Sequence, residues 1–287
     1  MSHDRHIERA RTALAIVIVA AVTVAVHAID SDRSSVILGG IRNSAHLPLF
    51  VFLTLLIHKI TSANSLKTVA TVACISLLAE GSQYVSGGEP DVLDLLSDAA
   101  GLAIALSAWR LWFASRRRLA LGFVLLGFAP MAFWCWTWKV RANQMPCIAD
   151  FDNPFLSAIQ RPLNAEIIEA NPNEVQLALQ PNRYAGIRLI DPVADWSGFS
   201  QIEIMVSTTP ETPITIRIHD SAHNNEHADR YNEQIAGTGA KLVIPLERIR
   251  QAPAARPLNL TQISEVTFFA VDPAQGTTLK LATPCLL

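Results

Sequence analysis

A set of polar side chains lies within apolar segments of the N-terminal half, where ionisable groups are costly and often functional. This polar cluster comprises the side chains of His46, Glu80, Gln83, Asp94 and Asp98, together with Gly101 on the same stripe as the two aspartates. Glu80 and Gln83 are three residues apart, which places both on one face of a helix. The spacing of Asp94, Asp98 and Gly101 likewise favours a single face, and the glycine would let a neighbouring helix approach closely.

Two interpretations of this polar cluster are open. In the first, the cluster is functional: the side chains of His46, Glu80, Asp94 and Asp98 form a pocket at the outer leaflet that holds a headgroup, a cation or a proton, or His46, Glu80 and Asp94 act as acid–base groups. Closely placed carboxylates raise each other's pKa, so a shared proton fits this interpretation. In the second, the same groups hydrogen-bond to one another and fix the register of the helices.

The segments that carry the cluster are predicted to cross a membrane. Only 17% of the residues are charged and 50% are hydrophobic, whereas soluble domains carry about a quarter charged residues. Apolar stretches near the length of about 20 residues that a span needs occur at 12–29, 46–60, 66–84, 94–113 and 119–138. The first could instead be a signal peptide, but no A-x-A-like cleavage site follows it, so we expect it to be retained.

The distribution of Lys and Arg predicts the orientation. With the N-terminus in the cytoplasm, five spans leave the C-terminus outside, and cytoplasmic segments hold nine basic residues against four in outer segments near the membrane. This asymmetry obeys the positive-inside rule. Trp134, Trp136 and Trp138 then lie at the outer end of the last span, where aromatic belts occur.

The run LLAEGSQYVSGGEPDVLDLLSDAAGLAIAL resembles the VanZ-like membrane proteins. The pattern of that family is an early His, E-x-x-Q, a Gly-Arg loop and D-x-x-x-N-x-x-G, and the matching residues are His46, Glu80, Gln83, Asp94 and Gly101. The loop Arg is absent, and Asp98 replaces the usual Asn. The resemblance covers residues 10–115 and implies a bacterial cytoplasmic (inner) membrane protein. The family is linked by name to glycopeptide resistance. The resemblance therefore implies a location in the cell envelope and does not identify a reaction.

From Cys147 onward the sequence consists of short runs of alternating apolar and polar residues, separated by Pro, Gly and Asn. Candidate strands are 165–168, 175–179, 185–189, 202–207, 214–219, 241–245, 265–270 and 279–282. Short strands at this spacing indicate an all-β sandwich of the jelly-roll type. The predicted fold is therefore multi-domain: a transmembrane helical domain (1–138), a linker (139–146) and an extracytoplasmic, periplasmic β-sandwich (147–287).

Two of the four cysteines bracket the predicted sandwich. Cys74 and Cys135 fall within spans and are expected to be small apolar side chains. Cys147 and Cys285 lie at the two ends of the exported domain, where disulfides persist. We therefore favour a disulfide between them over two unrelated thiols.

The motif DWSGF at 195–199, followed by IRIHD and KLVIPLERI, resembles galactose-binding-like sandwiches that occur as carbohydrate-binding modules. That resemblance implies a non-catalytic sugar-binding role. The polar loop after the IRIHD strand contains the planar hydrogen-bonding groups that sugar recognition needs, and Trp196, Tyr231 or Tyr184 could supply an aromatic platform. The candidate ligand-binding residues are Trp196, Asp220, His223, Asn224, Asn225, Asp229, Arg230 and Tyr231. The alternative is a solvated loop with local turn bonds.

Metal and cofactor sites are not predicted. His219, His223 and His227 have helical spacing, yet His219 should end a strand, which disfavours zinc. Calcium held by Asp220 and Asp229 is a further alternative. Neither a G-x-S-x-G, an H-E-x-x-H, a Walker loop nor a C-x-x-C motif occurs, and no basic stripe indicates nucleic acid.

Three hypotheses follow. The first is an envelope protein, embedded in the lipid bilayer, whose outer sandwich binds a glycan or glycolipid. The second is a membrane-embedded enzyme that acts on a lipid-linked or surface polysaccharide through Glu80, Asp94 and His46. The third is a scaffold whose sandwich docks another envelope protein.

Overall fold

The structure is a computed structural model that describes residues 14, 35–61, 64–85, 92–181, 183–223 and 227–287. These residues belong to two compact units. One contains Leu38–Cys135, and the other contains Ser35–Ile37 and Trp136–Leu287. Apart from one residue, the expected span at 12–29 lies outside the described part of the chain.

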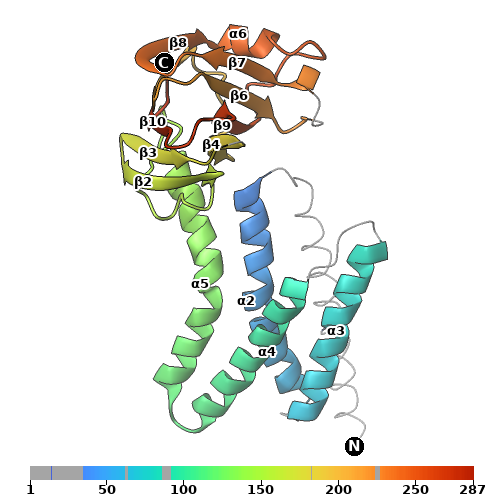
Figure 1. The fold of residues 1–287 in the computed structure, drawn as a ribbon. Coiled ribbons are helices and arrows are strands. Elements are labelled where there is room, and N and C mark those ends of the chain that lie inside the picture. Colours follow the sequence, from blue (N-terminus) through green and yellow to red (C-terminus); the bar gives the residue numbers. More distant parts are fainter. Residues whose placement is uncertain (1–13, 15–34, 62–63, 86–91, 182, 224–226) are drawn as a thin grey trace, which may run out of the picture. The chain divides into compact units, whose positions relative to one another are not determined.

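Four long helices are described before the first strand (Figure 1). They are α2 (Val36–Ile60), α3 (Ser65–Val85), α4 (Val92–Phe113) and α5 (Arg117–Ala142). All four overlap expected spans, but only α2 and α5 are long and apolar enough to cross a membrane by length and composition. The apolar part of α3 ends at Ala79, and α4 carries Asp94, Asp98 and Arg110. The expectation of five spans is thus reduced to two helices among the described residues.

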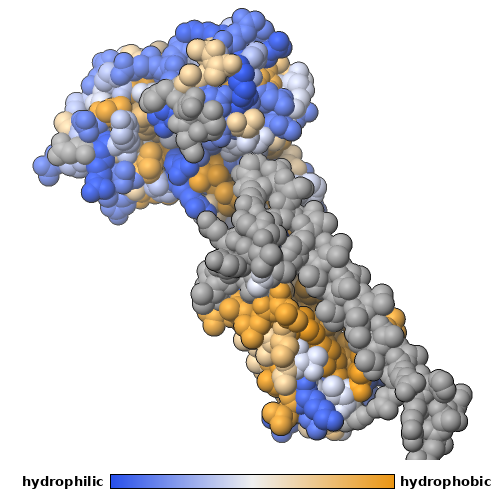
Figure 2. All heavy atoms as spheres, turned by 90° about the vertical axis from the view of Figure 1, so that its right-hand side faces the viewer, coloured by the Kyte–Doolittle hydropathy of each residue, from blue (hydrophilic) through white to orange (hydrophobic). Residues whose placement is uncertain are grey.

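The surface of the helical part is largely apolar, whereas the sandwich is mostly hydrophilic (Figure 2). On α5, Leu121, Leu125 and Leu126 are each more than half exposed. An exposed apolar surface of this kind is typical of a helix surrounded by lipid or by a protein partner.

Gly101 lies where α4 meets α2. A Cβ atom on this glycine would come within 2.8 Å of the Leu47 carbonyl oxygen and 2.9 Å of the Phe50 Cβ. Any side chain here would force the two helices apart, so the expected close approach at Gly101 is confirmed.

The C-terminal unit contains two antiparallel sheets, as the predicted sandwich requires. The first has the order β1-β4-β9-β6-β7, with bounds Gln160–Leu163, Tyr184–Ile190, Ile263–Val271, Ile214–Asp220 and Tyr231–Ile235. The second has the order β11-β5-β10-β3-β2, with bounds Cys285–Leu286, Gln201–Thr209, Thr278–Ala282, Glu174–Leu179 and Ala165–Asn171. Strand β8 (Thr238–Pro245) pairs with β5 and leads into the short helix α6 (Leu246–Gln251).

Alternation along the strands forms the core between the sheets. In β6, Ile214, Ile216 and Ile218 are fully buried, whereas the residues between them are partly exposed on the opposite face. This is the period-2 pattern of a strand with one face in the core. The positions of the predicted strand 214–219 are therefore confirmed.

The last turns of α5 belong to the same unit as the sandwich. The hydroxyl of Thr137 donates to the Phe155 carbonyl oxygen at 3.1 Å, and the rings of Trp136 and Phe155 meet at 6.2 Å. Nη1 of Arg141 lies 2.7 Å from Oδ1 of Asp191. The expected linker at 139–146 is thus helical as far as Ala142 and is held by side-chain contacts.

The predicted disulfide between Cys147 and Cys285 is present. It closes a loop with a sequence separation of 138 residues. Backbone hydrogen bonds flank it, from Ile148 to the Pro284 carbonyl at 2.9 Å and from Leu286 to the Pro146 carbonyl at 2.8 Å. The start and end of the sandwich are therefore joined both covalently and by strand-like pairing.

Loss of the disulfide is expected to destabilise the sandwich strongly. Replacing Cys147 and Cys285 together by Ala should lower its free energy of unfolding by about 4–5 kcal/mol, because the unfolded chain regains the entropy of a long open loop. Pulse proteolysis of the full chain in urea measures the change. A Cys74→Ser, Cys135→Ser variant, which alters only free thiols, is the control. Equal midpoints for the two variants would contradict the expectation.

Candidate functional site

The polar cluster predicted in the bundle forms in part around one imidazole. Nδ1 of His46 lies 3.2 Å from Oδ1 of Asp98, and Nε2 lies 4.0 Å from Oδ2 of Asp94. All three side chains are largely buried. Helices α2 and α4 thus bring together residues that are about 50 positions apart in the sequence.

Ser76 is a member of this cluster that the sequence analysis missed. Its hydroxyl donates to Oδ2 of Asp98 at 2.5 Å. Ser76 precedes Glu80 by four residues on α3, so helical spacing was a signal that could have found it. Glu80 and Gln83 lie in α3, but their side chains are outside the described part of the structure.

The geometry of the cluster favours proton exchange over nucleophilic attack. The Ser76 hydroxyl donates to Asp98, and His46 contacts the other oxygen of the same carboxylate, so Ser76 and His46 are linked through Asp98 and not in the direct serine–imidazole pair of an activated serine. His46 lies between two carboxylates, an arrangement that suits holding or passing a proton.

The loop predicted to bind sugar is built around an internal ion-pair network. Asp220 is 1% exposed and accepts hydrogen bonds from both terminal nitrogens of Arg256, at 2.6 and 2.7 Å. The backbone N–H of Asn259 also donates to Asp220 at 2.7 Å. Nε of Arg256 lies 2.7 Å from Oδ1 of Asp229, which is 2% exposed. Arg256 therefore binds both carboxylates. They face into the protein, whereas the sequence analysis expected them to face a ligand.

The pKa of Asp220 reflects this environment. Burial acts to raise the pKa, but the hydrogen bonds from Arg256 and from the backbone of Asn259 outweigh it and hold the pKa below its usual range. The carboxylate is thus ionised because its partners are inside the protein, not because it faces water.

Other residues of the predicted loop are also placed inward. The side chain of His223 lies 3.6 Å from the Asp229 carboxylate and stacks on His219 with a centroid distance of 4.5 Å. Arg230 is partly buried, and Asn224 and Asn225 lie outside the described residues. In the described part of the chain, no three His, Cys, Asp or Glu side chains are arranged to hold a metal ion.

Two of the expected aromatic platforms are in the core. Trp196 is 0% exposed, and its indole N–H donates to the Val193 carbonyl at 2.8 Å. Tyr231 is 2% exposed, and its hydroxyl donates to Glu233. Neither ring has a free face for stacking, because both fill the space between the sheets. Tyr184, in contrast, is 58% exposed.

Tyr184 belongs to a polar and aromatic surface on the outer side of the first sheet, which we call the sheet face. It consists of Tyr184, Arg188, Arg217, His219, Glu265 and Phe269, from β4, β6 and β9. Strand register places Arg217 opposite Thr267 and Arg188 opposite the same threonine, so both arginines flank the central strand. Their side chains point away from the core by alternation.

In the aromatic part of the sheet face, the Phe269 ring contacts two other side chains. The rings of Tyr184 and Phe269 meet edge to face at 5.6 Å, and the Arg217 guanidinium lies over the Phe269 ring at 4.7 Å. Nε of Arg217 also donates to the Asn232 amide oxygen at 3.1 Å. The guanidinium is thus fixed in one orientation on an aromatic ring.

The charged part centres on Glu265. Arg188 donates two hydrogen bonds to it, at 3.1 and 2.5 Å, and Nε2 of His219 lies 3.9 Å away. Burial acts to raise the pKa of Glu265, but the hydrogen bonds from Arg188 and Thr267 hold it below its usual range. Burial lowers the pKa of His219 and so favours the neutral imidazole, and this effect is partly opposed by Glu265.

The sequence analysis predicted a strand at 214–219 but assigned no site to its polar side. The polar positions of that strand are Thr215, Arg217 and His219, and the last two belong to the sheet face. Their common face was readable from period 2, whereas their partners on β4 and β9 depend on strand pairing that the sequence does not specify.

Comparison with known proteins found similarities to each of the two parts of the chain. Residues 5–113 match the family model described as VanZ/LLP1. The matched segment, which ends with α4, is similar to that family. No curated protein matches the chain.

Solved structures similar to the chain match the β-sandwich. The Family 11 carbohydrate-binding module from Clostridium thermocellum, solved with a beta-1,3-1,4-mixed-linked tetrasaccharide, shares 15% identity with a TM-score of 0.39. That match covers 50% of this chain and 94% of the module. A Family 29 module from Piromyces equi shares 11% identity with a TM-score of 0.29, covering 44% of this chain and 78% of that one. An exo-beta-agarase shares 14% identity with a TM-score of 0.37, covering 49% and 25%.

Removal of Arg256 should destabilise the sandwich, because two buried carboxylates then lose their cation. We expect Arg256→Ala to lower the free energy of unfolding by about 3 kcal/mol. Hydrogen exchange of the β6 amides in the full chain measures this loss. Arg250→Ala, which removes only an exposed ion pair to Glu247, should cost no more than about 1 kcal/mol. Similar losses for the two variants would contradict the internal role of Arg256.

Proposed function

We propose that this chain is a bacterial inner-membrane protein whose sandwich lies on the periplasmic side and binds an envelope glycan. Two apolar helices and the VanZ-like match support the membrane part. The disulfide supports export, because such bonds persist in oxidising compartments. The distribution of Lys and Arg supports a cytoplasmic N-terminus.

The observation that carries glycan binding is the composition of the sheet face. Tyr184 offers an exposed ring beside the buried Phe269. Ligand sites commonly combine aromatic surface with a small number of fixed polar groups that set orientation. On this face the fixed groups are the guanidinium groups of Arg217 and Arg188, each oriented by a partner.

Those polar groups match the chemistry of a sugar. Guanidinium N–H groups form a planar fork that can bind two acceptors at once, which suits neighbouring hydroxyl oxygens. The Glu265 carboxylate accepts hydrogen bonds, and the neutral His219 ring can donate from one nitrogen and accept at the other. The sheet face thus offers hydrogen-bond donors and acceptors beside an aromatic ring that can stack against the C–H face of a sugar.

The test is binding of the purified full chain in nanodiscs to soluble fragments of cell-wall glycans and exopolysaccharides. Tyr184→Ala and Arg217→Ala should each weaken binding about tenfold, because each removes a contact of the order of 1.4 kcal/mol. Lys241→Ala is the control, since Lys241 pairs with Glu203 on the other sheet. Absence of binding by the wild type to every glycan, or equal loss in the control, would refute the proposal.

A second candidate function is an intramembrane enzyme, favoured by the His46, Asp94 and Asp98 geometry. In this account His46 moves a proton during modification of a lipid-linked or surface polysaccharide. His46→Gln and Asp98→Asn should then abolish product formation on such a substrate while the protein still folds and inserts.

The matched control for the enzyme hypothesis is His58→Gln. His58 is also buried on α2, where its Nδ1 lies 2.8 Å from the Thr68 hydroxyl. Unchanged product formation in the His46 variant, or an equal loss in the His58 variant, would count against a catalytic role.

A further inference from the structure

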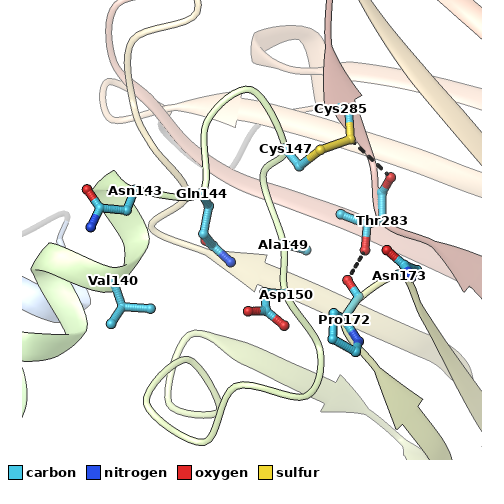
Figure 3. Close-up of a pocket in the computed structure, with 10 residues that line it drawn as sticks. All are labelled: Val140, Asn143, Gln144, Cys147, Ala149, Asp150, Pro172, Asn173, Thr283 and Cys285. Atoms are coloured by element: carbon cyan, nitrogen blue, oxygen red, sulfur yellow. Dashed lines mark hydrogen bonds between the residues drawn. A yellow bond between two sulfur atoms is a disulfide. The ribbon is translucent and has the colours of Figure 1, made fainter.

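A cleft next to the disulfide has features of a second ligand site. It has a volume of about 520 Å³ and lies where the end of α5, the Cys147–Cys285 bond and the loop before β3 meet (Figure 3). All of its lining residues belong to the unit that contains the sandwich. Its volume is within the range of about 300–1,000 Å³ that is typical of small-molecule sites.

Two residues that line this cleft each carry a buried side-chain atom that has no hydrogen-bond partner among the described residues. The atoms are Oδ1 of Asp150 and Nε2 of Gln144. Figure 3 shows the Gln144 amide directed toward the side of the cleft that holds Asp150. A buried polar group left unsatisfied costs about 1–3 kcal/mol, so a ligand group gains by satisfying it once the side chain turns into the cleft.

The two atoms require opposite partners. The carboxylate oxygen of Asp150 needs a donor, whereas the amide nitrogen of Gln144 needs an acceptor. A hydroxyl group is both, and two adjacent hydroxyls satisfy both atoms in several arrangements. An amine would satisfy Asp150 but would leave the Gln144 nitrogen without an acceptor.

The remaining lining residues narrow the class of ligand further. Asn143, Asn173 and Thr283 add amide and hydroxyl groups at the cleft, and no Lys, Arg or His is among the described residues that line it. A phosphate or carboxylate would therefore meet the negative Asp150 without a countercharge. An acyl chain would have to cover polar groups, which is costly without hydrogen bonds.

We propose that this cleft binds one residue of a neutral, hydroxyl-rich saccharide, either the head of a glycolipid or the end of a free glycan. The inference rests on the proposed glycan-binding function and adds a site separate from the sheet face. It also assigns a role to the end of α5. Val140 lines the cleft and lies one turn beyond Trp136, about 6 Å along the helix axis.

That position favours a ligand at the membrane surface. Trp136 and Trp138 are about half exposed near the end of α5, and exposed tryptophans are enriched at membrane–water interfaces. A sugar attached to a lipid headgroup would be held at this depth.

The experiment uses the full chain in nanodiscs and saturation-transfer NMR with methyl glucosides, methyl galactosides and methyl N-acetylglucosaminides as probes. We expect at least one probe to bind the wild type and to bind Asp150→Asn about tenfold more weakly. Gln144→Leu should show a similar loss. Asp152→Asn makes the same change at an exposed position two residues away and should bind as the wild type does.

A second arm separates the two sources of the saccharide. Glucosyl- or galactosyldiacylglycerol in the nanodisc should displace the bound probe if a lipid-linked sugar reaches the cleft. Continued probe binding in the presence of the glycolipid supports a free glycan as the ligand. Inorganic phosphate should not compete in either case.

The outcomes distinguish this inference from the proposed function. Binding that is lost in Tyr184→Ala and unchanged in Asp150→Asn overturns the cleft and leaves the sheet face in place. Binding that is lost in Asp150→Asn and unchanged in Tyr184→Ala supports the cleft and refutes the sheet face. If none of the probes binds the wild type, the cleft holds only water and the inference is wrong.

Discussion

The bond between Cys147 and Cys285 is the constraint on which the C-terminal unit depends, because it joins the entry and exit of the sandwich. Cys147 follows the end of α5 within a few residues, and Cys285 lies in the last strand. Backbone pairing on both sides of the bond continues this closure into the second sheet. The last turns of α5 are therefore fixed on a domain whose own ends are locked together. Both the cleft and its unpartnered polar atoms arise at this junction.

The sandwich contains charged side chains in two different settings. Around Arg256, two buried carboxylates share one cation and hold the loops that follow β6. On the sheet face, Arg188 and Glu265 pair at a surface that retains partial exposure, and Arg217 rests on an aromatic ring. Buried pairs of the first kind serve structure because they are costly to break. Groups of the second kind have a fixed orientation and remain accessible, which are the properties that ligand recognition needs.

The fold was predictable from the sequence where period and composition act locally. Alternation at 214–219 identified a strand, the bracketing cysteines indicated the disulfide, and Gly101 indicated a close helix contact. The candidate sugar site was less predictable. Asp220 and Asp229 belong to a loop rich in polar residues, and only the distant Arg256 makes them internal. Trp196 likewise fills the core, although its motif resembled the opening of a sugar-binding module. Such outcomes depend on long-range pairing, which residue type and spacing do not encode.

The central claim is that an oxidised sandwich lies on the outer side of the membrane, where envelope glycans are accessible. The most direct test is labelling of Cys147 and Cys285 in intact cells with a membrane-impermeant thiol reagent, before and after an impermeant reductant. The account predicts no labelling before reduction and labelling of both cysteines after it. Labelling of these thiols only after the inner membrane is permeabilised, without any need for reductant, would place the sandwich in the cytoplasm and contradict the account.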